Sequence, residues 1–164
     1  MKVHTLSRSQ FLPIPIDVAW SFFSSPNNLK EITPLHMGFH ILSITGSEGK
    51  MYAGQIICYR VKVLPFIATR WVTEITHVQE RFYFVDEQRI GPYALWHHEH
   101  RFHEVKGGVE ITDEVSYAIP FGILGQLANL LFVRREVNAI FEFRRKKLNQ
   151  LFSSPGNSEI KKSA

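Results

Sequence analysis

The longest run of regularly spaced apolar residues lies near the end of the chain, between residues 123 and 152. From Val133 onward, such residues recur every three or four positions, at Val133, Val137, Ile140, Phe141, Leu148 and Leu151. This spacing predicts an α-helix with one apolar face. The first part, 123–133, is apolar in most directions around the axis, so we expect it to be covered on several sides. The whole helix would be about 45 Å long, enough to cross a small domain.

Most of the remaining chain alternates between apolar and polar residues, which is typical of strands with one buried face. The predicted strands are 3–12, 39–44, 55–64, 67–75, 81–89, 95–105 and 109–119. Two short helices, 18–23 and 29–32, are predicted after the first strand. This order predicts an α+β fold, in which a curved seven-stranded antiparallel sheet wraps around the long C-terminal helix.

Size and composition narrow the class of protein. The chain has 164 residues, which suits a single domain over 1–152 and a small, polar, flexible tail over 153–164. Cys58 is the only cysteine, so no internal disulfide can form. The N-terminus does not have the pattern of a signal peptide, and no apolar run reaches the length of a membrane span. We therefore expect a cytoplasmic protein.

The charge of the chain is mildly basic and gives little sign of a nucleic-acid partner. The net charge is +4 and the isoelectric point is near 9.3. Much of the excess lies in residues 144–147 and in the tail. No basic stripe accompanies the aromatic residues, so a stacking platform for nucleic acid is not expected. The thirteen Phe residues indicate instead a large core or the wall of a cavity.

Several polar residues fall on the inner, apolar face of the last three strands. Assigning faces by alternation places Asp86, Gln88, His98, His100, Asp113 and Tyr117 on that face. A hairpin over residues 90–93 places Asp86 beside His98. A turn at Gly107-Gly108 pairs His98 with Tyr117. Because a buried polar group costs a few kcal/mol unless it has a partner, these residues should contact one another or a ligand.

Three explanations of this cluster remain open. It can be a self-satisfied network, the polar end of a ligand pocket, or a metal site formed by His98, His100 and a nearby Asp. The metal site is the least favoured, because no second pair of strong ligands has suitable spacing. A His-Asp pair also suits general base catalysis. No Ser, Cys or Lys shares the face as a nucleophile, so an acyl-enzyme is not expected.

Two segments resemble a known family. They are Phe84-Val-Asp-Glu-Gln-Arg-Ile-Gly-Pro-Tyr-Ala-Leu-Trp-His-His-Glu-His-Arg-Phe102 and Asp113-Glu-Val-Ser-Tyr-Ala-Ile-Pro-Phe-Gly-Ile-Leu-Gly125. Together with the order of elements over 1–152, they resemble the helix-grip, START-like superfamily, in particular its bacterial SRPBCC ligand-binding branch. The superfamily includes the birch-pollen allergen, START lipid-transfer domains and polyketide cyclases. The resemblance implies a cavity between sheet and long helix that holds a hydrophobic or amphipathic molecule, and it implies no catalytic residue.

We therefore expect a binding protein rather than an enzyme, with no cofactor, for a fatty acid, isoprenoid or polyketide-like compound. The expected ligand-binding residues are Ile57, Tyr59, Trp71, Phe84, Asp86, Gln88, Trp96, His98, His100, Tyr117, Leu124, Leu127, Ala128 and Leu131. Asp86, Gln88, His98, His100 and Tyr117 would form the polar end. One alternative is a cyclase or dehydratase in which His98, oriented by Asp86, acts as a general base. Another, less favoured, is a lipid carrier that docks to membranes through Arg144 to Lys147.

Overall fold

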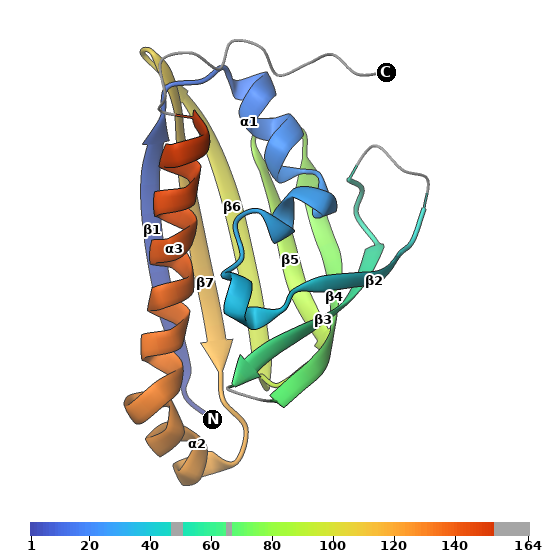
Figure 1. Ribbon diagram of the computed structural model, residues 1–164, viewed down its shortest axis with the longest axis vertical. Helices are drawn as coiled ribbons and strands as arrows, with labels where there is room; N and C mark the ends of the chain where they lie inside the picture. Colours follow the sequence, from blue (N-terminus) through green and yellow to red (C-terminus); the bar gives the residue numbers. More distant parts are fainter. Residues whose placement is uncertain (47–50, 65–66, 153–164) are drawn as a thin grey trace.

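The computed structural model describes residues 1–46, 51–64 and 67–152 (Figure 1). The tail predicted at 153–164 lies outside the described residues. The elements are β1 Val3–Leu12, α1 Ile16–Phe23, η1 Pro26–Lys30, η2 Leu35–Met37, β2 His40–Ile44, β3 Gln55–Leu64, β4 Ile67–Gln79, β5 Tyr83–Ile90, β6 Leu95–Val105, β7 Gly108–Ala118, α2 Gly122–Ala128, η3 Asn129–Val133 and α3 Arg134–Phe152. The predicted strands are all present, and the two predicted short helices correspond to α1 and η1.

The seven strands form one antiparallel sheet in the order β1-β7-β6-β5-β4-β3-β2. The sheet curves, α3 lies along it beside β1 and β7, and the short helices α1, η1 and η2 lie on the same side as α3 (Figure 1). This arrangement confirms the predicted α+β helix-grip fold. None of the helices in the described ranges is both long and apolar enough to span a bilayer.

The helix α3 faces the sheet with residues spaced by three and four positions. Val137, Phe141, Arg144 and Leu148 are buried on this side, as the helical period requires. Leu148 belongs to a core cluster with Leu12, Val109 and Ile111, among others, which closes one end of the molecule. The middle of α3 lies over a different region, where the sheet and helix leave space between them.

The predicted register between β6 and β7 is wrong by two residues. His98 faces Val115 and not Tyr117, and His100 faces Asp113. The turn consists of Lys106 and Gly107, because Gly107 alone adopts a positive φ of 87° and Gly108 already pairs with Val105. The shift brings Asp113 next to the two histidines. The predicted pairing of Asp86 with His98 is confirmed.

The predicted cover for residues 123–133 is also wrong. The long helix runs without a break from α2 through a π-helical turn, η3, into α3, but α2 and η3 extend beyond the ends of the strands (Figure 1). Leu124, Leu127, Leu130 and Leu131 are exposed there. The sheet therefore grips α3, while the apolar start of the helical segment projects past it.

Candidate functional site

A cavity of about 550 Å³ lies between the inner face of the sheet, the middle of α3 and the short helices. Volumes between about 300 and 1,000 Å³ are usual for sites that enclose a small organic molecule. Its wall is mainly aromatic and aliphatic; the aromatic members are Phe22, Phe23, Phe39, Tyr59, Trp71, Phe84, Tyr93, Trp96 and Phe141. Three lining residues, His36, Lys62 and Glu136, are exposed. They mark the opening, between η2, β3 and α3.

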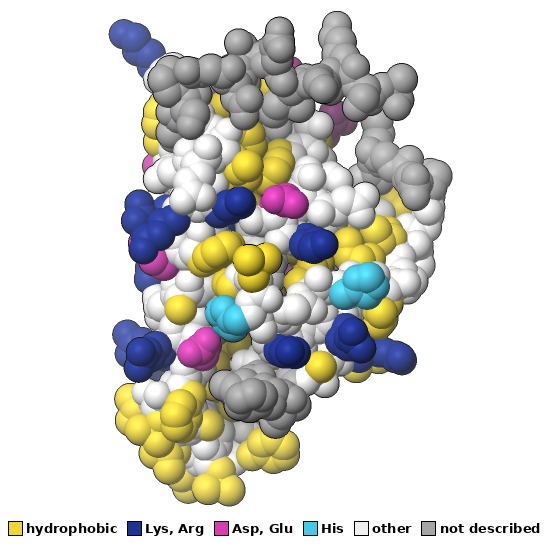
Figure 2. Space-filling model, in the orientation of Figure 1, with side chains coloured by type: hydrophobic (Ala, Val, Ile, Leu, Met, Phe, Trp, Pro, Cys, Tyr) yellow, Lys and Arg dark blue, Asp and Glu magenta, His cyan; other side chains and the backbone are white. Residues whose placement is uncertain are grey.

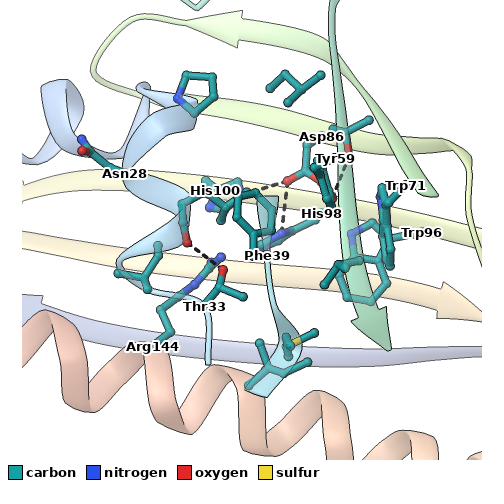
Figure 3. A pocket seen from close by; sticks show the side chains of 18 of the residues that line it. Asn28, Thr33, Phe39, Tyr59, Trp71, Asp86, Trp96, His98, His100 and Arg144 are labelled. Atoms are coloured by element: carbon teal, nitrogen blue, oxygen red, sulfur yellow. Dashed lines mark hydrogen bonds and ion pairs between the residues drawn. The ribbon is translucent and has the colours of Figure 1, made fainter. Parts of the chain in front are cut away.

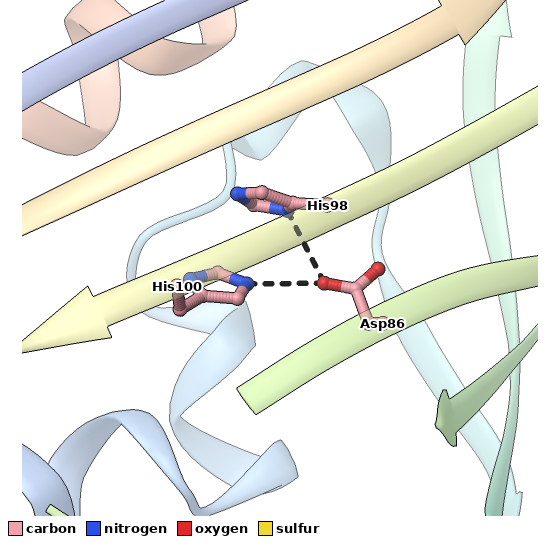
Figure 4. Close-up of side chains that lie close together, drawn as sticks. All are labelled: Asp86, His98 and His100. Atoms are coloured by element: carbon pink, nitrogen blue, oxygen red, sulfur yellow. Dashed lines mark hydrogen bonds and ion pairs between the residues drawn. The ribbon is translucent and has the colours of Figure 1, made fainter. Parts of the chain in front are cut away.

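A compact charged cluster forms part of the cavity floor (Figures 3 and 4). Asp86 Oδ2 lies 3.2 Å from His98 Nδ1 and 3.0 Å from His100 Nε2. On the other side, Asp113 Oδ1 lies 3.1 Å from His98 Nε2 and 2.8 Å from His100 Nδ1. Arg144 Nη1 donates to the same oxygen of Asp113 at 3.3 Å. Each imidazole is therefore held between two carboxylates. We call these five residues the His-Asp cluster.

The charges in the His-Asp cluster stabilise one another. Burial alone would raise the pKa of Asp86, but contact with His98 and His100 outweighs burial and holds the pKa well below its ordinary value. For Asp113 the charge of Arg144, with both histidines, likewise keeps the pKa low. Burial would lower the pKa of His98, but Asp86 and Asp113 raise it above its ordinary value.

The distances also bear on the protonation of His98. Its Nδ1 lies 3.2 Å from Asp86 and its Nε2 lies 3.1 Å from Asp113, and a nitrogen without a proton would place its lone pair against an anion. The arrangement therefore favours a proton on both nitrogens of His98, in keeping with its raised pKa. At His100 only Nε2 makes a hydrogen bond, to Asp86, while Nδ1 lies 2.8 Å from Asp113 in a poorer geometry.

The sequence predicted the polar residues at one end of the cavity. The His-Asp cluster lies instead in the middle of the cavity floor. Along β6, the inward residues are Trp96, His98, His100 and Phe102, so the histidines are flanked by aromatic rings on both sides. Phe84 stacks on His100 with ring centroids 4.1 Å apart. On the other side, Trp96 meets Trp71 edge to face at 5.4 Å. The cavity thus has two apolar ends and a charged centre.

Three buried nitrogen atoms of cavity-lining residues have no hydrogen-bond partner among the described residues. They are the Nδ1 of His100 and two donors, the indole nitrogen of Trp71 and the Nε of Arg144. A buried donor without a partner is destabilising by about 1–3 kcal/mol. A ligand oxygen within the cavity would satisfy these groups, which makes them specific features of a binding site.

The structure brings together eight of the predicted site residues. The cavity is lined by Ile57, Tyr59, Trp71, Phe84, Asp86, Trp96, His98 and His100. Gln88 lies outside it and holds the following loop: its amide nitrogen donates to the carbonyl oxygen of Tyr93 at 2.7 Å. Tyr117 also lies outside the cavity, and its hydroxyl donates to Asn129 Oδ1 at 3.2 Å.

The four predicted residues from the helical segment do not line the cavity. Leu124, Leu127 and Leu131 are exposed on α2 and η3, and Ala128 is half-buried on α2. The helical part of the wall comes instead from α3, through Glu136, Val137, Ile140, Phe141 and Arg144. The prediction failed because it placed the sheet under the start of the segment, whereas the sheet ends before it.

The most important residue that the sequence analysis missed is Arg144. It was assigned to an exposed basic run, but only 8% of its surface is exposed and its guanidinium lies over the Phe141 ring at 5.1 Å. A signal was present: Arg144 follows Val137 by seven positions and Phe141 by three, which places it on the apolar face.

Asp86, His98 and His100 also have the donor atoms for a metal ion, all within 4.8 Å of one another. These atoms already contact each other directly, at 3.0 Å and 3.2 Å in the pairs with Asp86. Arg144 adds a positive charge to the same cluster. The geometry therefore fits a network of ion pairs better than a cation site.

Comparison with solved structures confirms the fold. The protein TTHA0849 from Thermus thermophilus is 14% identical, with a TM-score of 0.65 over 90% of this chain and 99% of that chain. A norcoclaurine synthase point mutant from Thalictrum, in complex with a transition-state analogue, is 12% identical, with a TM-score of 0.64 over 92% and 96%. The di-domain ARO/CYC StfQ of the steffimycin biosynthetic pathway is 14% identical, with a TM-score of 0.68; 92% of this chain matches 51% of that one.

No family model matches the sequence. No curated protein matches it either. At the identities found among the solved structures, the similarity establishes the helix-grip fold that the two sequence segments predicted, and the function has to be argued from the cavity.

Proposed function

We propose that this protein binds an amphipathic small molecule in the cavity between the sheet and α3. The observation that carries the proposal is the unpartnered pair of donors, Trp71 Nε1 and Arg144 Nε, in the wall of a 550 Å³ aromatic cavity in the described part of the chain. An apolar ligand body would displace water from the aromatic wall, and an oxygen of the ligand would accept from one of these donors.

The position of the His-Asp cluster favours one shape of ligand. Because the cluster is central, a straight chain with a terminal carboxylate would lay methylene groups across charged residues if it filled the cavity. A ring-containing, polyketide-like compound can place an oxygen substituent near the centre and apolar rings at both ends. The unpartnered, positively charged donor of Arg144 in the cluster favours a phenolate, an enolate or another electron-rich oxygen at that point. Among the predicted ligands, we therefore favour the polyketide-like class.

A binding experiment tests this proposal. Purified protein is titrated by calorimetry with a hydroxylated anthraquinone and, separately, with a C16 fatty acid, and native mass spectrometry gives the stoichiometry. We expect a 1:1 complex with the anthraquinone and weaker uptake of the fatty acid. Uptake of neither compound would refute the cavity as a site for amphipathic ligands. Tighter binding of the fatty acid would refute the preferred shape.

A matched pair of tryptophan variants tests the donor. Trp71→Phe keeps an aromatic ring and removes the N–H, so the affinity for the anthraquinone should fall about fivefold, the effect of one hydrogen bond of about 1 kcal/mol. Trp20→Phe is the control, because Trp20 packs against Phe84 and Phe102 and does not line the cavity. Equal effects of the two substitutions would show that Trp71 donates no hydrogen bond to the ligand.

A second candidate function is ring closure or dehydration of a similar compound. His98 and His100 border the cavity, and two solved structures with this fold carry the names of a synthase and an ARO/CYC protein. Since both nitrogens of His98 already face carboxylates, the ring would have to turn away from Asp86 or Asp113 before it could donate a proton to a ligand, and it would then act as an acid and not as the predicted base. With a poly-β-ketone probe, the enzyme hypothesis requires faster loss of absorbance than in buffer. It also requires that His98→Gln abolish the acceleration without abolishing binding.

A further inference from the structure

The start of the C-terminal helical segment turns its apolar side away from the protein. Seven large side chains there have between 52% and 88% of their surface exposed. They are Phe121, Ile123, Leu124, Leu127, Leu130, Leu131 and Phe132, and we call them the apolar tip. In Figure 2 hydrophobic atoms gather at the lower end of the molecule, where Figure 1 places α2. A contiguous exposed patch of this kind is typical of an interaction surface.

The opposite side of the same segment is small or polar and is fixed to the body of the protein. Asn129 is buried and accepts from the Tyr117 hydroxyl, and its amide nitrogen lies 3.2 Å from His4 Nε2. His4 Nε2 also lies 3.0 Å from Gln126 Oε1. At Gly125 a Cβ would lie 1.9 Å from the carbonyl oxygen of Pro120, so this side approaches the backbone closely. These contacts hold the leucines outward.

The backbone entering the tip is strained in a way that presents an apolar ring to solvent. Phe121 adopts a φ of 70°, a left-handed conformation that is unfavourable for a residue with a side chain. Its ring is among the most exposed in the described part of the molecule. The fold thus accepts an unfavourable conformation and keeps Phe121 at the surface, which is expected when an exposed residue has a function.

Charges around the apolar tip are mainly positive. Residues 115–135 and 1–16 contain no Asp or Glu, while Lys2, Arg134 and Arg135 are exposed, and the nearest acidic residue along the helical segment is Glu136, directly after Arg135. The N-terminal strand belongs to this region because His4 contacts Gln126. Apolar side chains bordered by cations are the pattern of a segment that lies in the interface of an anionic bilayer.

We propose that the apolar tip docks on a bilayer containing anionic phospholipid. Its apolar side chains would enter the boundary between head groups and acyl chains, and Arg134 and Arg135 would contact lipid phosphates. This surface differs from the basic run 144–147 predicted from the sequence. In that run Arg144 is buried, and Arg145 and Lys146 both pair with Glu142.

The same charges disfavour a second copy of the chain as the occupant. A two-fold dimer brings the same patch of both subunits together. Lys2, Arg134 and Arg135 of one copy would then approach those of the other, and in the described part of this region Glu136 alone would be available to offset these three cations. An anionic lipid surface would both cover the apolar side chains and neutralise the cations.

Docking would also orient the cavity, an extension that rests on the proposed function. Glu136, one of the exposed residues at the cavity opening, follows Phe132 by about one helical turn. A docked protein would therefore hold its opening near the lipid surface. An apolar ligand could then pass between bilayer and cavity with a short exposure to water.

Sedimentation with vesicles tests the docking itself, without any cavity ligand. Full-length protein is mixed with sucrose-loaded vesicles of phosphatidylcholine alone or with 30% phosphatidylglycerol, at 50 and 500 mM salt. We expect the protein to pellet with the anionic vesicles at low salt, with weaker binding at high salt and to neutral vesicles. Failure to pellet with anionic vesicles at low salt would overturn the proposal and leave the cavity function untouched.

Matched variants locate the surface. Leu124→Ser/Leu130→Ser should reduce binding at least about tenfold, because each leucine would otherwise bury apolar area. Arg134→Gln/Arg135→Gln should reduce it about 30-fold on anionic vesicles, at about 1 kcal/mol per cation near the surface. Leu35→Ser, at an exposed leucine of η2, and Lys146→Gln/Lys147→Gln should bind like the wild type. Loss of binding only in the Lys146/Lys147 variant would overturn the assignment to the apolar tip.

A fluorescent label distinguishes insertion from other modes of contact. In a Cys58→Ser background, Leu130→Cys labelled with the environment-sensitive dye NBD should shift to shorter wavelength with anionic vesicles, and the same label at Leu35→Cys should not. Light scattering after size exclusion gives the oligomeric state. A dimer that Leu124→Ser/Leu130→Ser dissociates, together with no dye shift, would identify a second copy as the occupant and overturn the proposal.

Discussion

Replacing Arg144 by methionine should be among the most destabilising single changes on α3. Arg144 is buried and donates to Asp113 at 3.3 Å, and the substitution leaves a buried carboxylate with one cation fewer. Removing one partner of a buried ion pair costs about 3–5 kcal/mol. We expect the lower end, about 3 kcal/mol, because His98 and His100 still face Asp113. For a domain of this size the midpoint of thermal unfolding should fall by about 6–12 °C.

The next residue offers a control with the same chemistry. Arg145 pairs with Glu142 at 2.8 Å but is exposed. Arg145→Met should therefore change the free energy of unfolding by less than about 1 kcal/mol. Urea unfolding at pH 7, followed by circular dichroism, compares the two variants. Equal effects of the two single substitutions would refute the buried ion pair as a source of stability.

Two further predictions concern other parts of the molecule. Because the pKa of His98 is raised, the folded state holds this proton more tightly than the unfolded chain. The resulting stability is full below about pH 6.5 and is lost as pH rises through the folded pKa. Urea unfolding between pH 6 and 9 should show this decline in wild type and in His97→Gln, but not in His98→Gln. Gly125→Ala should lower the free energy of unfolding by about 2 kcal/mol, because its Cβ would clash with the carbonyl oxygen of Pro120. Leu127→Ala, exposed on the same helix, should have almost no effect in the same assay, and a neutral Gly125→Ala would contradict the close packing.

The fold could be predicted because alternation and helical spacing are local and repeated. Every strand has at least one regular face, and the paired strands need only short turns, so their order along the chain largely determines the sheet. The register between paired strands is harder to predict from the sequence, because it depends on the conformation of single residues in the turn. Gly107 takes the positive φ and Gly108 does not, and that one difference moves His100 opposite Asp113.

The candidate site could be predicted only where strands form it. Alternation identified Asp86, His98 and His100 as inward-facing, and all three line the cavity. The helical part of the wall was misplaced because the spacing of apolar residues along a helix does not show which part of the protein packs against them. Leu124 and Leu131 have the composition of core residues, yet they lie past the ends of the strands and are exposed. Arg144 was missed for the opposite reason. Its charge suggested that it is exposed to solvent, but its position on the helix places it on the buried face with Phe141 and Leu148.

The pairing of the first strand with the last has a consequence for biosynthesis. Val3 pairs with Ala118 and Leu12 with Val109, so β1 has no partner in the described sheet until β7 has been made. At the usual speed of translation, the ribosome needs on the order of 10 s to add the residues between them. During that interval the backbone N–H and C=O groups of β1 lack their partners in β7, so a chaperone can bind this segment. The sheet can close only when β7 has left the exit tunnel.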